Sequence, residues 1–353
     1  MRSPMIRPYL TTRSLTPENQ ETPINFIDGG PVDIQLFYRR NHFSYPGMTN
    51  VNYWLPVNGL VANPKWFSLQ DLRGMPSKTL KVVLECAGNK RSLFEPKTPG
   101  EQWGKGAVSQ GYWKGVPLRL LLEQAGVMGS AKEIVVQGHD FGKRTDTDSL
   151  YSYKRSLPIE KALHPDTIVA YEYNGEPLPV KHGSPLRLIV PQWYAMASVK
   201  WIKQIRVIDS SFEGPFQSTD YVYYPNKEND EGAYPVTTMN VNATIQQPLD
   251  MDVKNTGKHM IKGIAWSGEG QITKVEISTD GGQTWAEADL IKESDVGYGW
   301  TNWAYEWHVA KKGEFTILAK ATDFQNRTQP VTPFWNRKGY GYNAIEKITV
   351  KIE

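Results

Sequence analysis

The chain has 353 residues, of which 39% are hydrophobic and 22% charged, and its formal net charge is +3. This composition is typical of a globular protein and excludes a disordered chain, while the length predicts two domains. The weak net charge argues against a nucleic-acid partner, which would need a concentrated basic surface.

The first 225 residues are predicted to form a mixed α/β domain. Residues 118–125 carry apolar side chains at helical spacing between Pro117 and Gly126, which predicts a helix with a proline start and a glycine stop. Asn174-Gly175 is a type I′ turn signal and predicts a hairpin between residues 171–173 and 177–180. Strands are predicted, in chain order, at 34–38, 80–84, 133–137, 167–173, 186–190 and 202–208.

Residues 215–240 are rich in Pro, Gly, Tyr and Asn and predict a connection to a second domain, which we place at 226–353. Beyond the connection, apolar and polar residues alternate in strand-like runs separated by turns such as Asp280-Gly281-Gly282. The runs lie at 259–266, 272–278, 303–309, 315–321 and 345–352. Strands at this spacing predict a β-sandwich, so the expected fold class is α+β.

Cys86 is the only cysteine, and it lies in the octet Leu84-Glu85-Cys86-Ala87-Gly88-Asn89-Lys90-Arg91 after a predicted strand. A thiolate is a preferred ligand of soft metals, and Lys90 and Arg91 are expected to supply the cations that lower its pKa. A lone cysteine is usually a buried packing residue, but a polar turn at a strand end favours a site. One cysteine also excludes an iron–sulfur cluster or an attached c-type haem within the chain.

Other polar residues also lie at the ends of predicted strands. Arg39 to His42 follow the first strand, His139 and Asp140 follow another, and His182 precedes a third. A lone histidine is more often a hydrogen-bonded packing residue than a functional one, so the residues alone leave these positions open.

The octet closely resembles the molybdenum-ligating motif of the sulfite oxidase family, usually Cys-Ala-Gly-Asn-Arg-Arg, with Lys90 in place of the first arginine. The resemblance continues from about Phe37 to the C-terminus, and residues 278–285 resemble a hairpin of the family's second domain. It implies a molybdopterin-binding domain followed by an immunoglobulin-like domain that forms the contact of a homodimer.

The resemblance also implies roles for individual residues. Arg40-Asn41-His42 is similar to a segment that meets the cofactor, with Arg40 reaching the substrate, and Cys86 is the implied molybdenum ligand. Further implied cofactor contacts, on the pterin or at its phosphate end, are Asp140, His182, Arg187, Ser198 and Lys200. The implied substrate pocket comprises Arg40, Arg91, Trp103, Tyr221 and either Lys338 or Arg337.

Two segments depart from the family pattern. Lys338 stands where the family has a substrate arginine, and lysine supplies charge without a planar fork. Trp193 and Tyr194 stand where vertebrate and plant members have a glycine-rich stretch, and bulky side chains do not allow the same close backbone approach. The contacts made by residues 192–196 therefore stay open.

The resulting prediction is a molybdenum-dependent oxidoreductase that oxidises sulfite to sulfate and passes electrons to a separate acceptor such as a cytochrome. The expected cofactor is molybdopterin with molybdenum, without haem, flavin or an iron–sulfur cluster. No stretch approaches the ~20 apolar residues of a membrane span, and the first 31 residues lack a secretory signal core, so we expect a cytoplasmic protein. Alternatives are reduction of nitrate or a sulfoxide at the same centre, or a non-catalytic β-sandwich scaffold.

Overall fold

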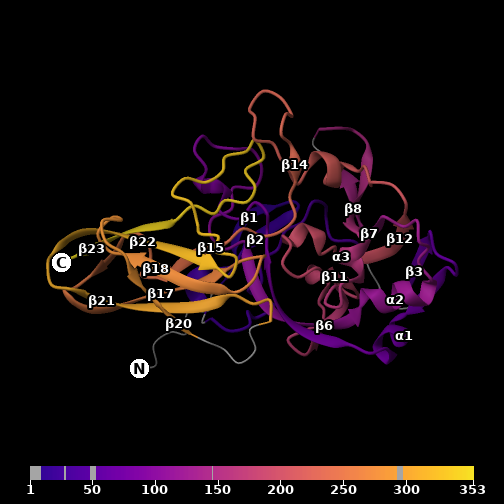
Figure 1. Cartoon of the computed structure of the whole chain (residues 1–353), viewed down its shortest axis with the longest axis horizontal. Coiled ribbons are helices and arrows are strands. Elements are labelled where there is room, and N and C mark those ends of the chain that lie inside the picture. Colours follow the sequence, from indigo (N-terminus) through magenta and orange to yellow (C-terminus); the bar gives the residue numbers. More distant parts are fainter. Residues whose placement is uncertain (1–8, 28, 48–52, 145, 292–296) are drawn as a thin grey trace.

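The computed structural model describes residues 9–27, 29–47, 53–144, 146–291 and 297–353. A mixed α/β part, at the right of Figure 1, is followed in the chain by a β-sandwich that ends at the C-terminus. Within the described residues, no helix is long and apolar enough to cross a membrane.

Two five-stranded sheets build the mixed part. The first has the order β10-β9-β6-β5, with β11 also beside β9, and the second has the order β4-β3-β12-β7-β8. The strands of the first sheet are β5 (Lys78–Glu85), β6 (Val108–Pro117), β9 (Ile168–Tyr173), β10 (Glu176–Pro177) and β11 (Arg187–Ile189). Those of the second are β3 (Trp54–Gly59), β4 (Lys65–Ser68), β7 (Glu133–Lys143), β8 (Leu150–Pro158) and β12 (Ile202–Ile208).

Three short α-helices accompany these sheets: α1 (Leu69–Gly74), α2 (Leu118–Ala125) and α3 (Ile159–Leu163). The predicted helix is confirmed as α2, because its apolar face is buried and Gly126 ends it in the left-handed conformation with φ 69°. A capping box between Ser68 and Asp71 starts α1.

The prediction of a strand at residues 34–38 is wrong. The segment is a turn in which Asp33 accepts hydrogen bonds from the backbone of Gln35 and Leu36 at 2.8 and 2.9 Å. Phe37 and Tyr38 are both buried, which a strand with one covered face would not produce. An aspartate that bonds its own following backbone favours a turn over a strand.

The hairpin after Asn174-Gly175 forms, with both residues at positive φ as a type I′ turn requires. Its return strand was predicted at 177–180, but β10 is Glu176–Pro177 and a 3₁₀ turn, η3 (Val180–His182), follows. Pro177 and Pro179 lack the N–H groups that would continue the ladder.

The second part is a sandwich of two sheets, with strand orders β15-β17-β21-β20 and β16-β23-β22-β18-β19. All five predicted strands are present, and the apolar core lies between the two sheets. One sheet comprises β15 (Asn242–Gln247), β17 (Gly257–Trp266), β20 (Asp289–Ile291) and β21 (Thr301–Val309). The other comprises β16 (Asp252–Lys254), β18 (Ile272–Ser278), β19 (Ala286–Glu287), β22 (Gly313–Asp323) and β23 (Glu346–Ile352).

The connection between the two parts is more ordered than its composition predicts. It contains a π-helical turn, η5 (Pro215–Thr219), and a hairpin of β13 (Val222–Tyr223) and β14 (Tyr234–Pro235). Trp266, Trp300 and Tyr340, which follow the connection in the chain, belong to the core cluster of the mixed part. The sandwich is therefore packed firmly against the part that carries Cys86.

Candidate active site

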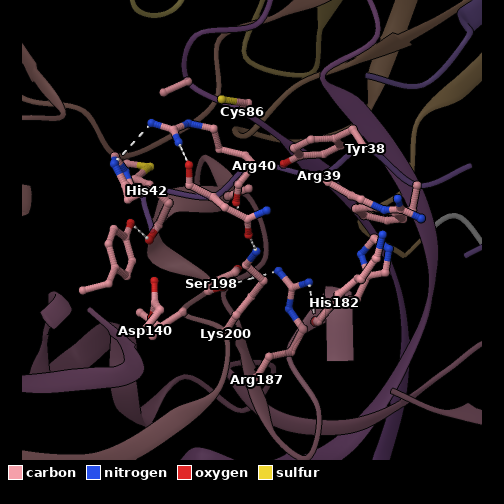
Figure 2. A pocket seen from close by; sticks show the side chains of 18 of the residues that line it. Tyr38, Arg39, Arg40, His42, Cys86, Asp140, His182, Arg187, Ser198 and Lys200 are labelled. Atoms are coloured by element: carbon pink, nitrogen blue, oxygen red, sulfur yellow. Dashed lines mark hydrogen bonds between the residues drawn. The ribbon is translucent and has the colours of Figure 1, made fainter. Parts of the chain in front are cut away.

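Cys86 lies in the wall of a pocket that collects side chains from both sheets and from several loops (Figure 2). Ten residues predicted for the site line this pocket together: Arg40, Asn41, His42, Cys86, Asp140, His182, Arg187, Ser198, Lys200 and Tyr221. They come from sequence positions as far apart as 40 and 221, so only the fold brings them into one cavity.

Cys86 directly follows β5, in a turn whose backbone is fixed by hydrogen bonds. Its N–H donates to the Ala107 carbonyl at 2.9 Å, and its carbonyl accepts from Asn89 N–H at 2.8 Å. A Cβ at position 88 would lie 2.7 Å from the guanidinium of Arg91, so glycine there leaves room for the Arg91 side chain. The sulfur-bearing side chain is thereby presented to the pocket by a rigid strand end.

Burial raises the pKa of the Cys86 thiol, and the cations of Arg40 and Arg91 act in the opposite direction. The expectation that Lys90 supplies one of these cations is wrong. Its ammonium group is fully buried and bonds Asn242, Ala243 and Glu346 of the sandwich instead. The left-handed backbone of Lys90, with φ 62°, is part of the turn that carries its side chain in this direction.

The end of the pocket away from Cys86 is cationic. Arg187 donates to the carbonyls of His182 and Ser198 at 3.1 and 3.3 Å, and its guanidinium lies over the ring of Trp113. Lys200 donates to the carbonyl of Arg40 at 3.1 Å and to the Asn41 side chain. Burial lowers the pKa of Lys200 and brings the pKa of Arg187 to about 10.

Three buried nitrogen atoms of residues that line this pocket, Arg39 Nε, His182 Nε2 and Arg187 Nε, have no hydrogen-bond partner within the described structure. Buried polar atoms are normally satisfied, so these atoms point to an absent polar ligand. A phosphate group offers the acceptors and the negative charge that this set of donors lacks. The residues therefore fit the phosphate end of molybdopterin.

Asp140 lies within β7, at a bulge, and burial raises the pKa of its carboxyl group. It is the acidic residue among those that line the pocket, so it can accept hydrogen bonds from a donor-rich ring system. Among the described residues, no group of three or more His, Cys, Asp or Glu side chains could hold a metal by itself. Cys86 would therefore have to share a metal with ligands from a bound cofactor.

Arg40, His42 and Tyr221 form a short hydrogen-bonded chain beside Cys86. Arg40 Nη2 donates to His42 Nδ1 at 3.2 Å, and His42 Nε2 lies 2.7 Å from the Tyr221 hydroxyl oxygen. Burial and the nearby cations hold the pKa of His42 well below its usual value, so the ring is neutral. Because Nδ1 accepts from Arg40, Nε2 carries the proton and donates to Tyr221. The hydroxyl proton of Tyr221 then goes to another acceptor, either Tyr153, with which Tyr221 has a side-chain hydrogen bond, or a bound ligand.

A second cavity adjoins the first one at Cys86. It shares Arg40, His42, Cys86 and Tyr221 with the first pocket and adds, among others, Arg91, Glu101, Asp220, Lys338 and Tyr340. Arg91 is held by carbonyls, since its Nε donates to Lys338 O at 3.0 Å and its Nη1 to Glu101 O at 3.1 Å. Three cationic side chains thus border a small space beside the thiol.

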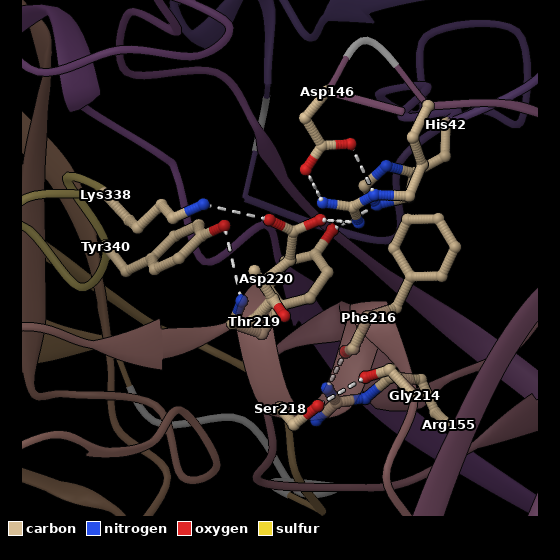
Figure 3. A network of polar contacts seen from close by, with 12 residues as sticks. His42, Asp146, Arg155, Gly214, Phe216, Ser218, Thr219, Asp220, Lys338 and Tyr340 are labelled. Carbon is tan, nitrogen blue, oxygen red and sulfur yellow. Dashed lines mark hydrogen bonds and ion pairs between the residues drawn. The ribbon is translucent and has the colours of Figure 1, made fainter. Parts of the chain in front are cut away.

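Asp220 organises the edge of this cavity (Figure 3). One carboxylate oxygen accepts from Lys338 at 3.1 Å, and the other accepts from Arg144 at 2.6 Å. Tyr340 stacks on Tyr221 with ring centroids 5.3 Å apart. Asp220, Arg144 and Tyr340 were not predicted from the sequence, although Asp220 immediately precedes the predicted Tyr221.

Two residues predicted for the substrate pocket lie outside both cavities. Trp103 is fully buried in the core cluster that also contains Cys86. Arg337 pairs with Asp230 and lies over the ring of Tyr224. Of the two neighbouring cations, Lys338 is the one at the cavity.

The bulky side chains of Trp193 and Tyr194 do not line the pocket. Tyr194 is buried and its hydroxyl accepts from Asn240 N–H, while the ring of Trp193 packs under Lys161. The pocket wall is made by the next residues, Ala195 and Met196, in the 3₁₀ turn η4 (Ala195–Ala197).

Comparisons with known proteins agree with this geometry. Residues 42–216 match the family described as oxidoreductase molybdopterin binding domain, and residues 233–353 match the Mo-co oxidoreductase dimerisation domain. The chain is 32% identical over 369 residues to mitochondrial sulfite oxidase of Mus musculus, which covers 99% of this chain and 67% of that protein. It is 30% identical over 375 residues to sulfite oxidase of Arabidopsis thaliana, with 99% and 95% covered.

Nitrate reductase (NADH) 2 of Phaseolus vulgaris is also similar, at 30% identity over 366 residues, covering 95% of this chain and 41% of that protein. Among solved structures, the sulfane dehydrogenase SoxCD from Paracoccus pantotrophus matches with a TM-score of 0.84 at 26% identity. That match covers 99% of this chain and 91% of the other. The predicted fold class, a mixed α/β part followed by a β-sandwich, is confirmed.

Proposed function

The chain belongs to the sulfite oxidase family of molybdopterin-dependent oxidoreductases, and we propose that it oxidises sulfite to sulfate. The observation that carries this proposal is the cationic cavity beside Cys86, bordered by Arg40, Arg91 and Lys338. When bound, the molybdenum cofactor supplies oxygen-atom transfer and takes up two electrons. The protein's task is to hold a small anion next to it.

Arg40 and Arg91 are fixed before any substrate arrives. Arg40 is tied to His42, and Arg91 to carbonyls on either side of the cavity. Preorganised cations lose little side-chain entropy on binding an oxyanion, and guanidinium groups can bond it through two N–H groups at once. Tyr221, whose hydroxyl accepts from His42, donates its own proton to an oxygen of the anion.

Conversion of sulfite to sulfate consumes one water and releases two electrons and two protons. We propose that the electrons pass to a separate acceptor such as a cytochrome. The test is an assay of cofactor-loaded protein with sulfite and a dye acceptor, beside reductive assays with nitrate and a sulfoxide. Rapid sulfite-dependent dye reduction supports the proposal, whereas faster nitrate or sulfoxide reduction would replace it, and no turnover in any arm would favour a scaffold.

Lys338 is expected to contribute binding rather than chemistry. Its side chain is one-third exposed and forms an ion pair with Asp220. Its contact with an anion is therefore weaker than that of a buried arginine. We expect Lys338→Ala to raise the KM for sulfite about five- to tenfold with little change in kcat, and Lys338→Arg to lower the KM. Steady-state kinetics check this, with Arg337→Ala as the neighbouring control that leaves KM unchanged. Equal KM values in all three variants would remove Lys338 from the site.

We further propose that residues 226–353 form an immunoglobulin-like domain that makes a homodimer. The matched dimerisation domain supports this, as do exposed apolar side chains on the sandwich at Leu249, Met251, Val253 and Met260. Stable interfaces usually bury more than about 1,000 Å². Light scattering should therefore give a dimer at nanomolar concentration and a monomer for the Val253→Glu, Met260→Glu double variant. A monomer of the unaltered protein at micromolar concentration would contradict the proposal.

A further inference from the structure

An N-terminal hairpin lies against the cationic end of the pocket. It consists of β1 (Thr11–Leu15) and β2 (Glu18–Glu21), which form a two-stranded sheet of their own near the middle of the view in Figure 1. The hairpin lies outside the matched molybdopterin-binding domain, which begins at residue 42. An isolated two-stranded hairpin is marginally stable in water, so its contacts with the pocket must hold it in place.

Glu18 makes the contact at the pocket rim. Its carboxylate accepts from Lys181 Nζ at 3.1 Å and Arg39 Nη1 at 3.3 Å, and also from the Tyr45 hydroxyl. Arg39 and Lys181 both line the cofactor pocket. Their side chains are 15% and 47% exposed, so both line the pocket and also reach the protein surface. Glu18 thus joins two cations that border this end of the pocket.

The hairpin also reaches further inside through Asn19, which is 1% exposed. Asn19 Oδ1 accepts from Asn41 N–H at 2.7 Å, and Asn41 Nδ2 donates to the Glu18 carbonyl at 2.6 Å. Asn41 Oδ1 in turn accepts from Lys200, which lines the pocket. The position of Lys200 therefore depends on the hairpin through one intervening residue.

Backbone hydrogen bonds complete the attachment. Gln20 N–H donates to Arg39 O at 2.9 Å, and Arg39 N–H donates to Gln20 O at 2.7 Å. Asn19 Nδ2 donates to Glu101 at 3.1 Å, and Glu101 borders the substrate cavity. The strand β2 consequently spans from the cationic end of the cofactor pocket toward the second cavity.

We propose that this hairpin is a latch that closes the phosphate end of the cofactor pocket, and that Glu18 is the positioning residue that fastens it. The inference rests on the proposed function only in that the pocket must bind a pterin phosphate. Arg39 and Lys181 are shared between the Glu18 carboxylate and the pocket. With the cofactor in place, Glu18 keeps both cations folded over the phosphate end and blocks the route of release.

The test measures pterin retention in the full-length, cofactor-loaded protein. Pterin released into buffer is oxidised to a fluorescent product and followed over time, in unaltered protein and in Glu18→Gln, Lys181→Gln and the double variant. Glu18→Gln removes the negative charge that accepts hydrogen bonds from both cations, and losing one charge-assisted hydrogen bond corresponds to roughly tenfold in an equilibrium, so we expect about tenfold faster release. The double variant should release no faster than the faster single variant, because both changes open the same latch.

Glu306→Gln serves as the matched control, since Glu306 pairs with Lys258 on the surface of the sandwich with 60% of its side chain exposed. Hydrogen exchange of residues 11–21 gives a second readout: their amides should exchange slowly in loaded protein and faster after Glu18→Gln. Unchanged pterin release in Glu18→Gln, or hairpin exchange that does not respond to cofactor loading, would overturn the latch. Retained pterin without sulfite oxidation would refute the proposed substrate alone, whereas purified protein without pterin would refute both proposals.

Discussion

Cys86→Ser is expected to abolish turnover and to reduce the molybdenum content of the purified protein. A neutral hydroxyl is a much poorer ligand of a soft metal than a thiolate. Even residues that only orient a metal ligand cost ten- to a hundredfold when replaced, so loss of the ligand itself should lower activity by more than about a hundredfold. Elemental analysis and pterin content, measured on the same samples, read the metal and the organic cofactor separately.

The substitution changes one atom, so the cofactor-free proteins should unfold at similar denaturant concentrations. That comparison shows that lost activity does not come from a damaged fold. Met128→Leu, at an exposed position of the mixed part, is a control that should retain full metal content and activity. Full activity of Cys86→Ser, or active protein without molybdenum, would refute the assignment of Cys86 as ligand.

Sequence periodicity predicted the regular elements that have one buried face. The helix α2 and the strand β12 were predicted because their apolar residues recur at the spacing of the covered side. The strand β5 is buried on both faces at its end and was predicted from its continuous apolar run instead. Residues 34–38 were wrongly predicted to be a strand. Asp33 accepts a hydrogen bond from the following backbone, and the apolar side chains Phe37 and Tyr38 are buried in an irregular loop. Apolar content alone does not distinguish a strand from a buried turn.

The candidate site was predicted mainly through family resemblance. Residues such as Arg40, Cys86 and Tyr221 are far apart in the chain, and no local pattern reports that they share a cavity. The direction in which each side chain points was harder still to predict. The Trp103 side chain enters the core, and Arg337 and Lys338 diverge although they are adjacent. Side-chain direction in loops depends on contacts between distant segments, which one sequence does not display.

The direction of the Lys90 side chain was likewise not predicted from the sequence. Its contacts lead to the prediction with the largest effect on stability. Its ammonium group donates to Asn242 Oδ1 at 2.8 Å, Ala243 O at 2.7 Å and Glu346 Oε2 at 3.0 Å. These partners are 152 or more residues away in the chain. The Lys90 and Glu346 side chains are 0% and 2% exposed. The loop that presents Cys86 is therefore anchored in the sandwich by a buried ion pair.

Glu346→Gln should destabilise the protein by about 3 to 5 kcal/mol at neutral pH, because it removes the hydrogen-bonded counter-charge of the buried Lys90 ammonium. The carboxyl that remains near Lys90 is Glu85, and burial raises its pKa to about 7, so it is only partly ionised at neutral pH. Lys105 pairs with the same carboxylate, but its side chain is 25% exposed. Replacing Lys105 with an uncharged residue should therefore lower the free energy of unfolding by about 1 kcal/mol or less. Glu353→Gln, in an exposed pair with Lys351, is the matched control and should be nearly neutral. Denaturant unfolding of the four proteins measures these differences.

The destabilisation should also depend on pH with a defined sign. Burial already lowers the pKa of Lys90, and Glu346 opposes that shift, so Glu346→Gln lowers the pKa further. The unfolded chain, with a lysine pKa of about 10.4, then binds more protons than the folded one, and stability rises with pH in that window. The difference between Glu346→Gln and unaltered protein should therefore shrink as pH is raised from about 7 toward about 10. A small loss at neutral pH, or a loss that does not change with pH, would show that Lys90 does not carry a buried charge that depends on Glu346.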